Sequence, residues 1–171
     1  LDIGCGGNSP YLTKLIYPNC RYVGIDRDFS YHNNQSSISL IDRKIKHDLN
    51  ENLQNLEEKI SDENFDIIIF NHTIEHTTNG LEILKLVVTK LNKNGVIYIE
   101  FPSVRSLNLP SMRGTLNFCD DKTHIRIYTV QEVANLLLSF NCKIIKGGRR
   151  FNLFSILIIF FRIINFIIYR K

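Results

Sequence analysis

The sequence has no tryptophan, one methionine and four scattered cysteines. No two cysteines form a Cys-x-x-Cys pair, and none has a histidine at metal-ligand spacing. This pattern argues against a disulfide framework and a zinc module, so we expect no metal ion. We also find no N-terminal basic-then-apolar stretch of the kind that marks a secretory signal peptide. Reduced cysteines are usual in the cytosol, and we therefore expect a cytoplasmic protein.

The common phosphate-binding motifs are missing as well. Gly4 and Gly6 begin a Gly-x-Gly pattern, but Ser9 stands where a dinucleotide fingerprint needs its third glycine. The Gly-Lys-Ser/Thr of a P-loop is absent. These gaps argue against a nicotinamide-dependent oxidoreductase, which stays open as an alternative, and against a P-loop nucleotidase.

Acidic residues are absent from 143–171, which carries seven Lys and Arg. The first 142 residues hold the other 14 basic residues and all 17 acidic ones, so the front of the chain is mildly acidic. The overall charge of +4 is too small to indicate nucleic-acid binding by itself. We therefore expect residues 1–142 and residues 143–171 to lie in different environments.

What the chain does contain is an alternation of strands and helices. Its 171 residues, 44% of them hydrophobic, suit one globular domain. Apolar runs such as FDIIIFN are typical of strands buried on both faces, which belong to parallel sheets. After a first strand that ends at the glycines, we expect strands at 21–26, 44–48, 65–71, 95–103 and 142–148, and helices at 11–17, 51–60, 81–91 and 129–140. This order predicts an α/β fold with a mostly parallel sheet.

Helix boundaries are marked at three places. Ser9 and Pro10 suit an N-cap and first helical position, and Thr129 with Glu132 forms a capping box. Asn94-Gly95 suits the C-cap of helix 81–91.

A glycine turn and two strand-end acids carry the functional hypothesis, and we expect the turn and Asp26 to converge on one ribose. Gly4 and Gly6 let the backbone turn sharply and approach a ligand closely. Asp26 ends the second strand, where a carboxylate can accept hydrogen bonds from both ribose hydroxyls. The alternative is a structural turn and a solvated acid. Asp48, at the end of the third strand, suits either an adenine amine or the N-cap of helix 51–60.

Several motifs in sequence order resemble the class I S-adenosylmethionine-dependent methyltransferases. They are Asp2-x-Gly4-x-Gly6, the strand-end Asp26 and Asp48, FDIIIFNHTIEH, LNKNGVIYIEFPS and DKTHIRIYTVQEVANLL. Within that class the chain is similar to the small-molecule type, in the methyltransferase type 11 and type 23 domain families. The resemblance implies a three-layer Rossmann-like, doubly wound sheet of the seven-stranded type in residues 1–148, lacking its terminal strand. It also implies S-adenosylmethionine as cofactor. Because Leu1 already lies inside a motif, we expect a fragment.

The resemblance also assigns residues to the cofactor. The glycine turn, with Cys5 between its two glycines, would lie against the methionine and ribose portion. The other assigned residues are Asp2 near the ammonium group, Asp26 at the ribose, Asp48 and Leu49 beside the adenine, and Asn71 and His72 at the methionine end. Arg27 departs from the family, in which the residue after the ribose acid is often apolar and packs on adenine. Its guanidinium can stack there or point to solvent.

Methyl transfer needs a general base only when the acceptor must lose a proton. His72, His76 and His124 are the candidates, and Glu75 is a weaker one. Each has a structural alternative, such as packing under the sheet for His76 or anchoring a loop for His124. Catalysis by orientation alone also stays open.

The segment 149–171 is apolar between basic residues, with Arg162 inside it. We weigh a membrane-associated anchor, a hydrophobic lid over a greasy acceptor, and a core strand. The predicted acceptor is a small molecule, a lipid-linked intermediate or a glycan, at the inner face of a membrane if 149–171 anchors the chain. The remaining alternative is a non-catalytic Rossmann-like binding module.

Overall fold

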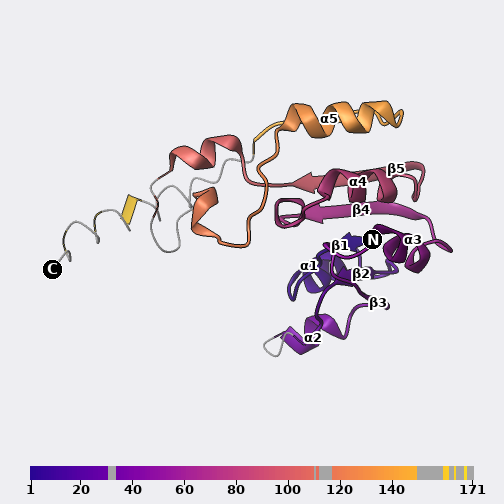
Figure 1. The fold of residues 1–171 in the computed structure, drawn as a ribbon. Helices are drawn as coiled ribbons and strands as arrows, with labels where there is room; N and C mark the ends of the chain where they lie inside the picture. Colours follow the sequence, from indigo (N-terminus) through magenta and orange to yellow (C-terminus); the bar gives the residue numbers. More distant parts are fainter. Residues whose placement is uncertain are drawn as a thin grey trace.

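The computed structural model describes residues 1–30, 34–109, 111, 117–149, 160, 161, 164 and 168. Five strands form one sheet in the order β3-β2-β1-β4-β5, and every neighbouring pair is parallel (Figure 1). The strands are β1 Asp2–Ile3, β2 Val23–Asp26, β3 Arg43–Lys46, β4 Phe65–Asn71 and β5 Leu91–Glu100. The predicted α/β fold with a parallel sheet is confirmed.

Within residues 1–149, as far as the structure describes them, five α-helices connect and cover the strands. They are α1 Ser9–Ile16, α2 Gln35–Ile38, α3 Leu53–Lys59, α4 Gly80–Val88 and α5 Val130–Ser139. Three short 3-10 turns, η2 Ile74–His76, η3 Val104–Asn108 and η4 Phe118–Asp120, lie in the loops after β4 and β5. Among the helices, α1 contacts α2, whereas α4 contacts both α3 and α5.

The sheet changes direction at β1. The chain builds outward from β1 through β2 to β3, and then returns to place β4 on the other side of β1. In such a sheet the loops after β1 and β4 diverge and leave a crevice at the carboxyl ends of the strands. The doubly wound sheet that the resemblance implies is therefore present, with its switch point between β1 and β4.

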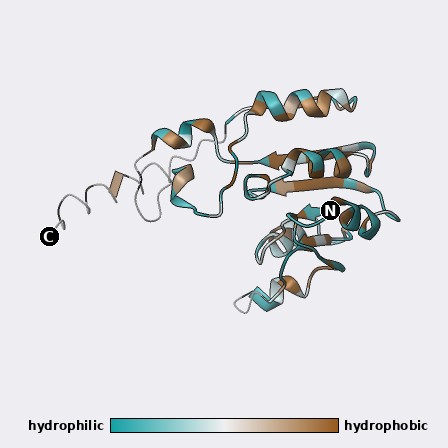
Figure 2. Ribbon diagram, in the orientation of Figure 1, coloured by the Kyte–Doolittle hydropathy of each residue, from teal (hydrophilic) through white to brown (hydrophobic). Residues whose placement is uncertain are grey.

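The core consists of two apolar clusters. The larger joins the sheet to α3, α4 and α5 through residues such as Ile25, Leu56 and Leu84. The smaller contains Cys5, Tyr22, Ile38 and Ile41, near α2. Figure 2 shows β4 as hydrophobic along most of its length, as expected of a central strand.

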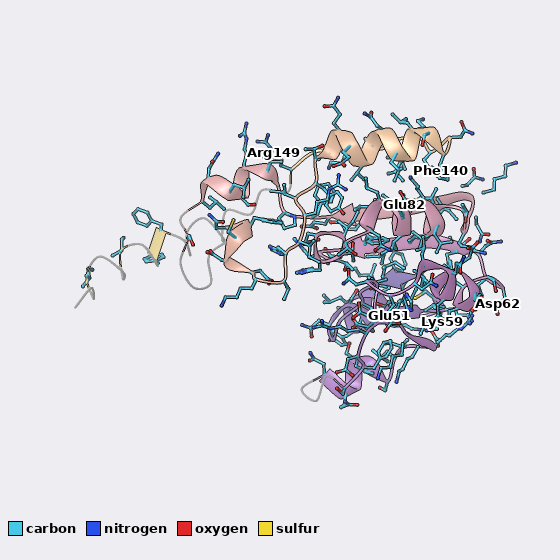
Figure 3. The ribbon with its side chains drawn as sticks, viewed as in Figure 1. Glu51, Lys59, Asp62, Glu82, Phe140 and Arg149 are labelled. Carbon is cyan, nitrogen blue, oxygen red and sulfur yellow. The ribbon has the colours of Figure 1, made fainter. Side chains whose placement is uncertain are left out.

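An ionic network ties the amino-terminal side of the sheet to the turn after α3. Glu63 accepts hydrogen bonds from Arg21, which precedes β2, and from Arg43 in β3. Arg43 also contacts Asp62 at 3.2 Å and donates to the Lys59 carbonyl at 2.9 Å. Lys59 and Asp62 are labelled at this edge of the molecule in Figure 3.

Two predicted helix ends need correction. Helix α1 begins at Ser9 with Asn8 as its N-cap, because the Ser9 hydroxyl donates to Asp2 instead of capping. Asn94 has a φ of 68° inside β5, where the register with β4 shifts, so it does not cap α4, which ends at Val88.

The sixth strand predicted at 142–148 is wrong. Asn141 turns the chain with a φ of 59°, and the following residues form no strand. Ile145 is 77% exposed. Apolar residues make a strand only where a neighbouring strand accepts their backbone hydrogen bonds, and this segment pairs with no described strand.

Most of the segment 149–171 lies outside the described residues, and so do the three alternatives weighed for it. Among the described residues, no helix has the length and apolar character needed to cross a membrane.

Candidate functional site

A cavity of about 500 Å³ opens at the carboxyl ends of the strands. It lies at the switch point of the sheet, where α/β proteins commonly bind ligands. Its walls come from the ends of β1 to β4, from η2 and from the loop before α5: Gly4, Asp26, Arg27, His47, Asp48, Leu49, Asn50, His72, Thr73, His76, Thr77, Lys122, Thr123 and Ile125.

Gly4 shapes the floor of this cavity. Its φ is +68°, and a Cβ atom built there would lie 2.5 Å from the Thr73 side chain. The Thr73 hydroxyl in turn donates to the Ile3 carbonyl at 2.9 Å. The loops after β1 and β4 therefore meet at a point where only glycine fits.

Asp26 and the glycine turn converge, as predicted. The Gly6 N–H donates to Asp26 Oδ2 at 2.8 Å, and the Asp28 N–H lies 3.2 Å from Oδ1. Asp26 is 7% exposed and lines the cavity together with Gly4. A buried carboxylate is thus held at the end of β2, against the turn that follows β1.

Asp2, Cys5 and Gly6 are not among the cavity residues. Asp2 is buried and accepts hydrogen bonds from Ser9 and Tyr22, so it ties the start of α1 to β2. Burial raises the pKa of Asp2, and these two hydrogen bonds oppose the shift. Cys5 packs in the smaller core cluster, where burial raises the pKa of its thiol. The buried Asp2 and Cys5 side chains therefore support the turn after β1 and do not line the cavity.

Asp48 and Leu49 form the wall at the end of β3. Asp48 Oδ1 accepts from the Asn50 N–H at 2.9 Å, which closes a local turn. The N-cap of α3 is Asn52, whose side chain accepts from the Gln54 N–H, so the helix-cap alternative for Asp48 is wrong. Leu49 is buried and lines the cavity, and its contact with adenine stays a prediction.

Arg27 and Asn71 differ in their placement. The exposed Arg27 lines the cavity next to Asp26, which is compatible with stacking on a flat ligand group. Asn71, the last residue of β4, is exposed and is not among the cavity residues.

His72 stands at the cavity wall between two carboxylates. Its Nδ1 lies 3.3 Å from Glu75 Oε1, and its Nε2 lies 3.5 Å from Glu100 Oε1. The hydrogen bond with Glu75 is the main reason that the pKa of His72 is raised, although burial opposes it. Its φ of 51° turns the chain sharply out of β4.

His76 and His124 are neighbours, although only His76 lines the cavity. Their ring centroids lie 4.7 Å apart, and the His124 ring also stacks on Phe118 at 4.5 Å. His124 Nδ1 lies 2.7 Å from the Phe118 carbonyl, which fits the predicted anchoring of the loop.

Sequence reasoning missed several cavity residues. In the sequence His47 looks like part of a strand. Residues 122–125 reach the cavity because the Ile125 and Arg126 N–H groups donate to the Glu75 carbonyl at 2.8 and 3.2 Å, a contact that no local sequence pattern predicts. The strand-end position could have pointed to His47. The missed residues are His47, Asn50, Thr73, Thr77, Lys122, Thr123 and Ile125.

Comparison with known families agrees with this geometry. A family model described as a methyltransferase domain matches residues 1–146. The chain belongs to the class I S-adenosylmethionine-dependent methyltransferases. No curated protein matches it.

Solved structures show the same methyltransferase fold. A SAM-dependent methyltransferase from Archaeoglobus fulgidus superposes with a TM-score of 0.60 at 21% identity, over 96% of this chain and 74% of that one. The plantazolicin methyltransferase BpumL, in complex with a pentazolic desmethylPZN analog and SAH, gives 0.58 at 20% identity, over 82% and 54%. An O-methyltransferase family protein from Burkholderia thailandensis gives 0.64 at 12% identity, over 88% and 46%. The chain thus spans about half the length of the last two.

Proposed function

We propose that this methyltransferase moves a methyl group from S-adenosylmethionine to a small-molecule acceptor bound at the cavity. The observation that carries the proposal is the hydrogen bond between the Gly6 N–H and Asp26, beside a cavity that Gly4 and Asp26 both line. Family membership favours this reaction over the nicotinamide-dependent alternative.

The residues present fit the adenosyl portion of the cofactor. A Cβ atom built on Gly6, at a φ of +55°, would meet no atom within 4 Å, so the turn is open on that side. Asp26 would accept from the ribose hydroxyls, and Leu49 and Asp48 would contact the apolar face and the amine of the adenine. The cofactor supplies the activated methyl group, and the protein supplies orientation.

The acceptor is assigned to the side of the cavity formed by η2 and residues 122–125. Polar side chains gather there, namely His72, His76, Lys122 and Thr123. These can hold an oxygen or nitrogen acceptor, and His72 and His76 remain the candidate bases because both line the cavity. The plantazolicin methyltransferase BpumL, solved in complex with a pentazolic desmethylPZN analog, supports an acceptor of this class.

Titration calorimetry with S-adenosylhomocysteine tests the cofactor assignment. We expect the wild-type protein to bind it, and Asp26→Asn to bind at least about tenfold more weakly, because hydrogen bonds to a charged group contribute about 1.5–3 kcal/mol. The asparagine can still accept from Gly6. Asp28→Asn, which changes an exposed acid two residues away, is the matched control and should bind like wild type.

Absence of binding by the wild-type protein would refute the proposal. Binding without methyl transfer to any acceptor would instead support a non-catalytic module. The membrane contact predicted for residues 149–171 stays a prediction, and so does a lipid-linked or glycan acceptor. Flotation with anionic vesicles, with and without those residues, tests the contact, and equal behaviour of the two forms would exclude it.

A further inference from the structure

We propose that Glu75, His76 and His124 bind a divalent transition-metal ion. One ligand atom from each lies within 4.8 Å of the others. Two of the residues belong to η2, and the third lies in the loop before α5, which is fastened to η2 by the bond from the Ile125 N–H to the Glu75 carbonyl. The site therefore depends on the fold and has no local sequence signature, which is why the sequence predicted no metal.

Glu75 is the strongest sign of a missing partner. Its side chain is 1% exposed, and Oε1 faces His72 at 3.3 Å. The other oxygen, Oε2, is buried and has no hydrogen-bond partner among the described residues. A buried carboxylate oxygen without a donor is costly, and a cation would satisfy it.

Both histidines are held in the form that a metal requires. Thr123 gives its single hydroxyl proton to Asp121 at 2.6 Å, so at 2.9 Å it can only accept from His76 Nδ1. His124 Nδ1 faces the Phe118 carbonyl at 2.7 Å, which is also only an acceptor. Each ring therefore carries its proton on Nδ1 and its lone pair on Nε2. Metal-binding histidines are typically oriented by such a second hydrogen bond.

The donor set selects the kind of metal. Two imidazoles and one carboxylate suit zinc, iron(II) or cobalt(II), whereas magnesium and calcium prefer oxygen ligands. Tetrahedral bonds of about 2.0–2.1 Å place ligand atoms about 3.4 Å apart, so side chains whose ligand atoms lie within 4.8 Å of one another would have to move closer to bind the ion. Rotations of the side chains can supply that movement.

The ion would lie at the wall of the cavity, since His76 and Thr123 line it. Three protein ligands leave a position for water or for an oxygen of the acceptor. There the metal would orient a hydroxyl acceptor and lower its pKa, and with His76 bound to the ion His72 would be the remaining candidate base. This role depends on the proposed methyl transfer, whereas binding of the metal does not.

The test is a titration of the chelator-treated protein with Zn²⁺, followed by calorimetry and thermal unfolding. We expect one ion per chain and a higher unfolding temperature. Substituting Co²⁺ should give visible d–d bands without a thiolate charge-transfer band. His124→Asn removes Nε2 but keeps a donor for the Phe118 carbonyl, and should weaken Zn²⁺ binding more than about 100-fold, because even outer partners of a metal site contribute 10–100-fold. His76→Asn should behave alike.

Three controls separate binding at this site from binding to a thiol or to any divalent cation. Cys119→Ser removes an exposed thiol of the neighbouring turn η4 and should leave Zn²⁺ binding unchanged. Mg²⁺ should not compete. The unfolding temperature of each histidine variant should not rise when Zn²⁺ is added, whatever its value without metal. Binding that survives both histidine substitutions, or no stoichiometric binding by the wild type, overturns the proposal, and S-adenosylhomocysteine affinity measured in parallel reports separately on the proposed function.

Discussion

Gly4 and Gly6 lie two residues apart with similar backbone angles but different surroundings. Both have a positive φ, yet only at Gly4 would a Cβ atom collide, with Thr73 at 2.5 Å. Left-handed backbone costs a residue with a Cβ about 1–2 kcal/mol, and overpacking adds about 1–3 kcal/mol. The two glycines therefore separate conformational cost from steric cost.

We predict that Gly4→Ala lowers the free energy of unfolding by about 1–3 kcal/mol more than Gly6→Ala does. Urea unfolding of the two variants measures this difference. Equal losses would show that Thr73 moves aside without cost, and that the contact between the two loops is loose.

At the residue scale, the sequence predicted contacts that follow from the order of strands and turns along the chain. A glycine turn followed by a strand-end acid predicted that Gly6 and Asp26 meet, because parallel strands end at one edge. The role of Thr73 was not predictable, since it depends on the packing between β1 and the loop after β4. The choice between two functions for Asp48 also needed the structure, which shows Asn52 as the cap.

Helix α5 is held at its start by a single side chain. Thr129 Oγ1 accepts from the Glu132 N–H at 3.1 Å, which confirms the predicted cap. The Glu132 carboxylate accepts from Arg126, so only the Thr129 half of the predicted capping box is shown. We expect Thr129→Ala to lower the free energy of unfolding by about 1 kcal/mol, whereas Thr129→Ser, which keeps the hydroxyl, should cost much less. Chemical denaturation compares them, and an alanine variant as stable as wild type would contradict the cap.

The turn after α3 is tied to β3 by charge. Hydrogen bonds from Arg21 and Arg43 lower the pKa of Glu63 to about 2, although burial of the carboxyl group opposes this shift. A carboxylate with a depressed pKa stabilises the fold above its ordinary pKa, and this stability is lost as the pH falls toward 2. Glu63→Gln should therefore destabilise the protein at neutral pH, with a difference from wild type that shrinks between about pH 4.5 and pH 2.

Thermal unfolding across that pH range measures the effect of the network. Glu58→Gln, a change at an exposed position of α3, is the matched control and should show no such pH dependence. A Glu63→Gln deficit that stayed constant down to pH 2 would mean that packing, and not charge, fastens the turn.

At the element scale, all five strands of the sheet were predicted, because each is a short segment with apolar residues that directly precedes a polar turn or a glycine turn. The sixth was predicted on the same pattern and is absent, because apolar composition does not reveal whether a strand has a neighbour. The helix end predicted at Asn94-Gly95 is wrong for a similar reason, since a residue with positive φ occurs at the register shift in β5 as well as at helix ends.

For the whole molecule, binding at the switch point should raise stability by mass action. Saturation with S-adenosylhomocysteine at about 100 times its dissociation constant adds about 2.7 kcal/mol, which corresponds to an unfolding temperature higher by about 5–10 °C. Differential scanning fluorimetry measures the shift. The shift should shrink for Asp26→Asn at the same ligand concentration, and an identical shift would place the ligand elsewhere.

The bond between the Gly6 N–H and Asp26 also bears on how such a protein can decay during evolution. Because the acid braces the bend after β1 even without a ligand, selection for folding alone would preserve it. A descendant that had lost methyl transfer would still carry an aspartate at position 26. An aspartate at this position in a distant homologue therefore indicates that the turn is preserved, and activity has to be inferred from residues that have no structural role.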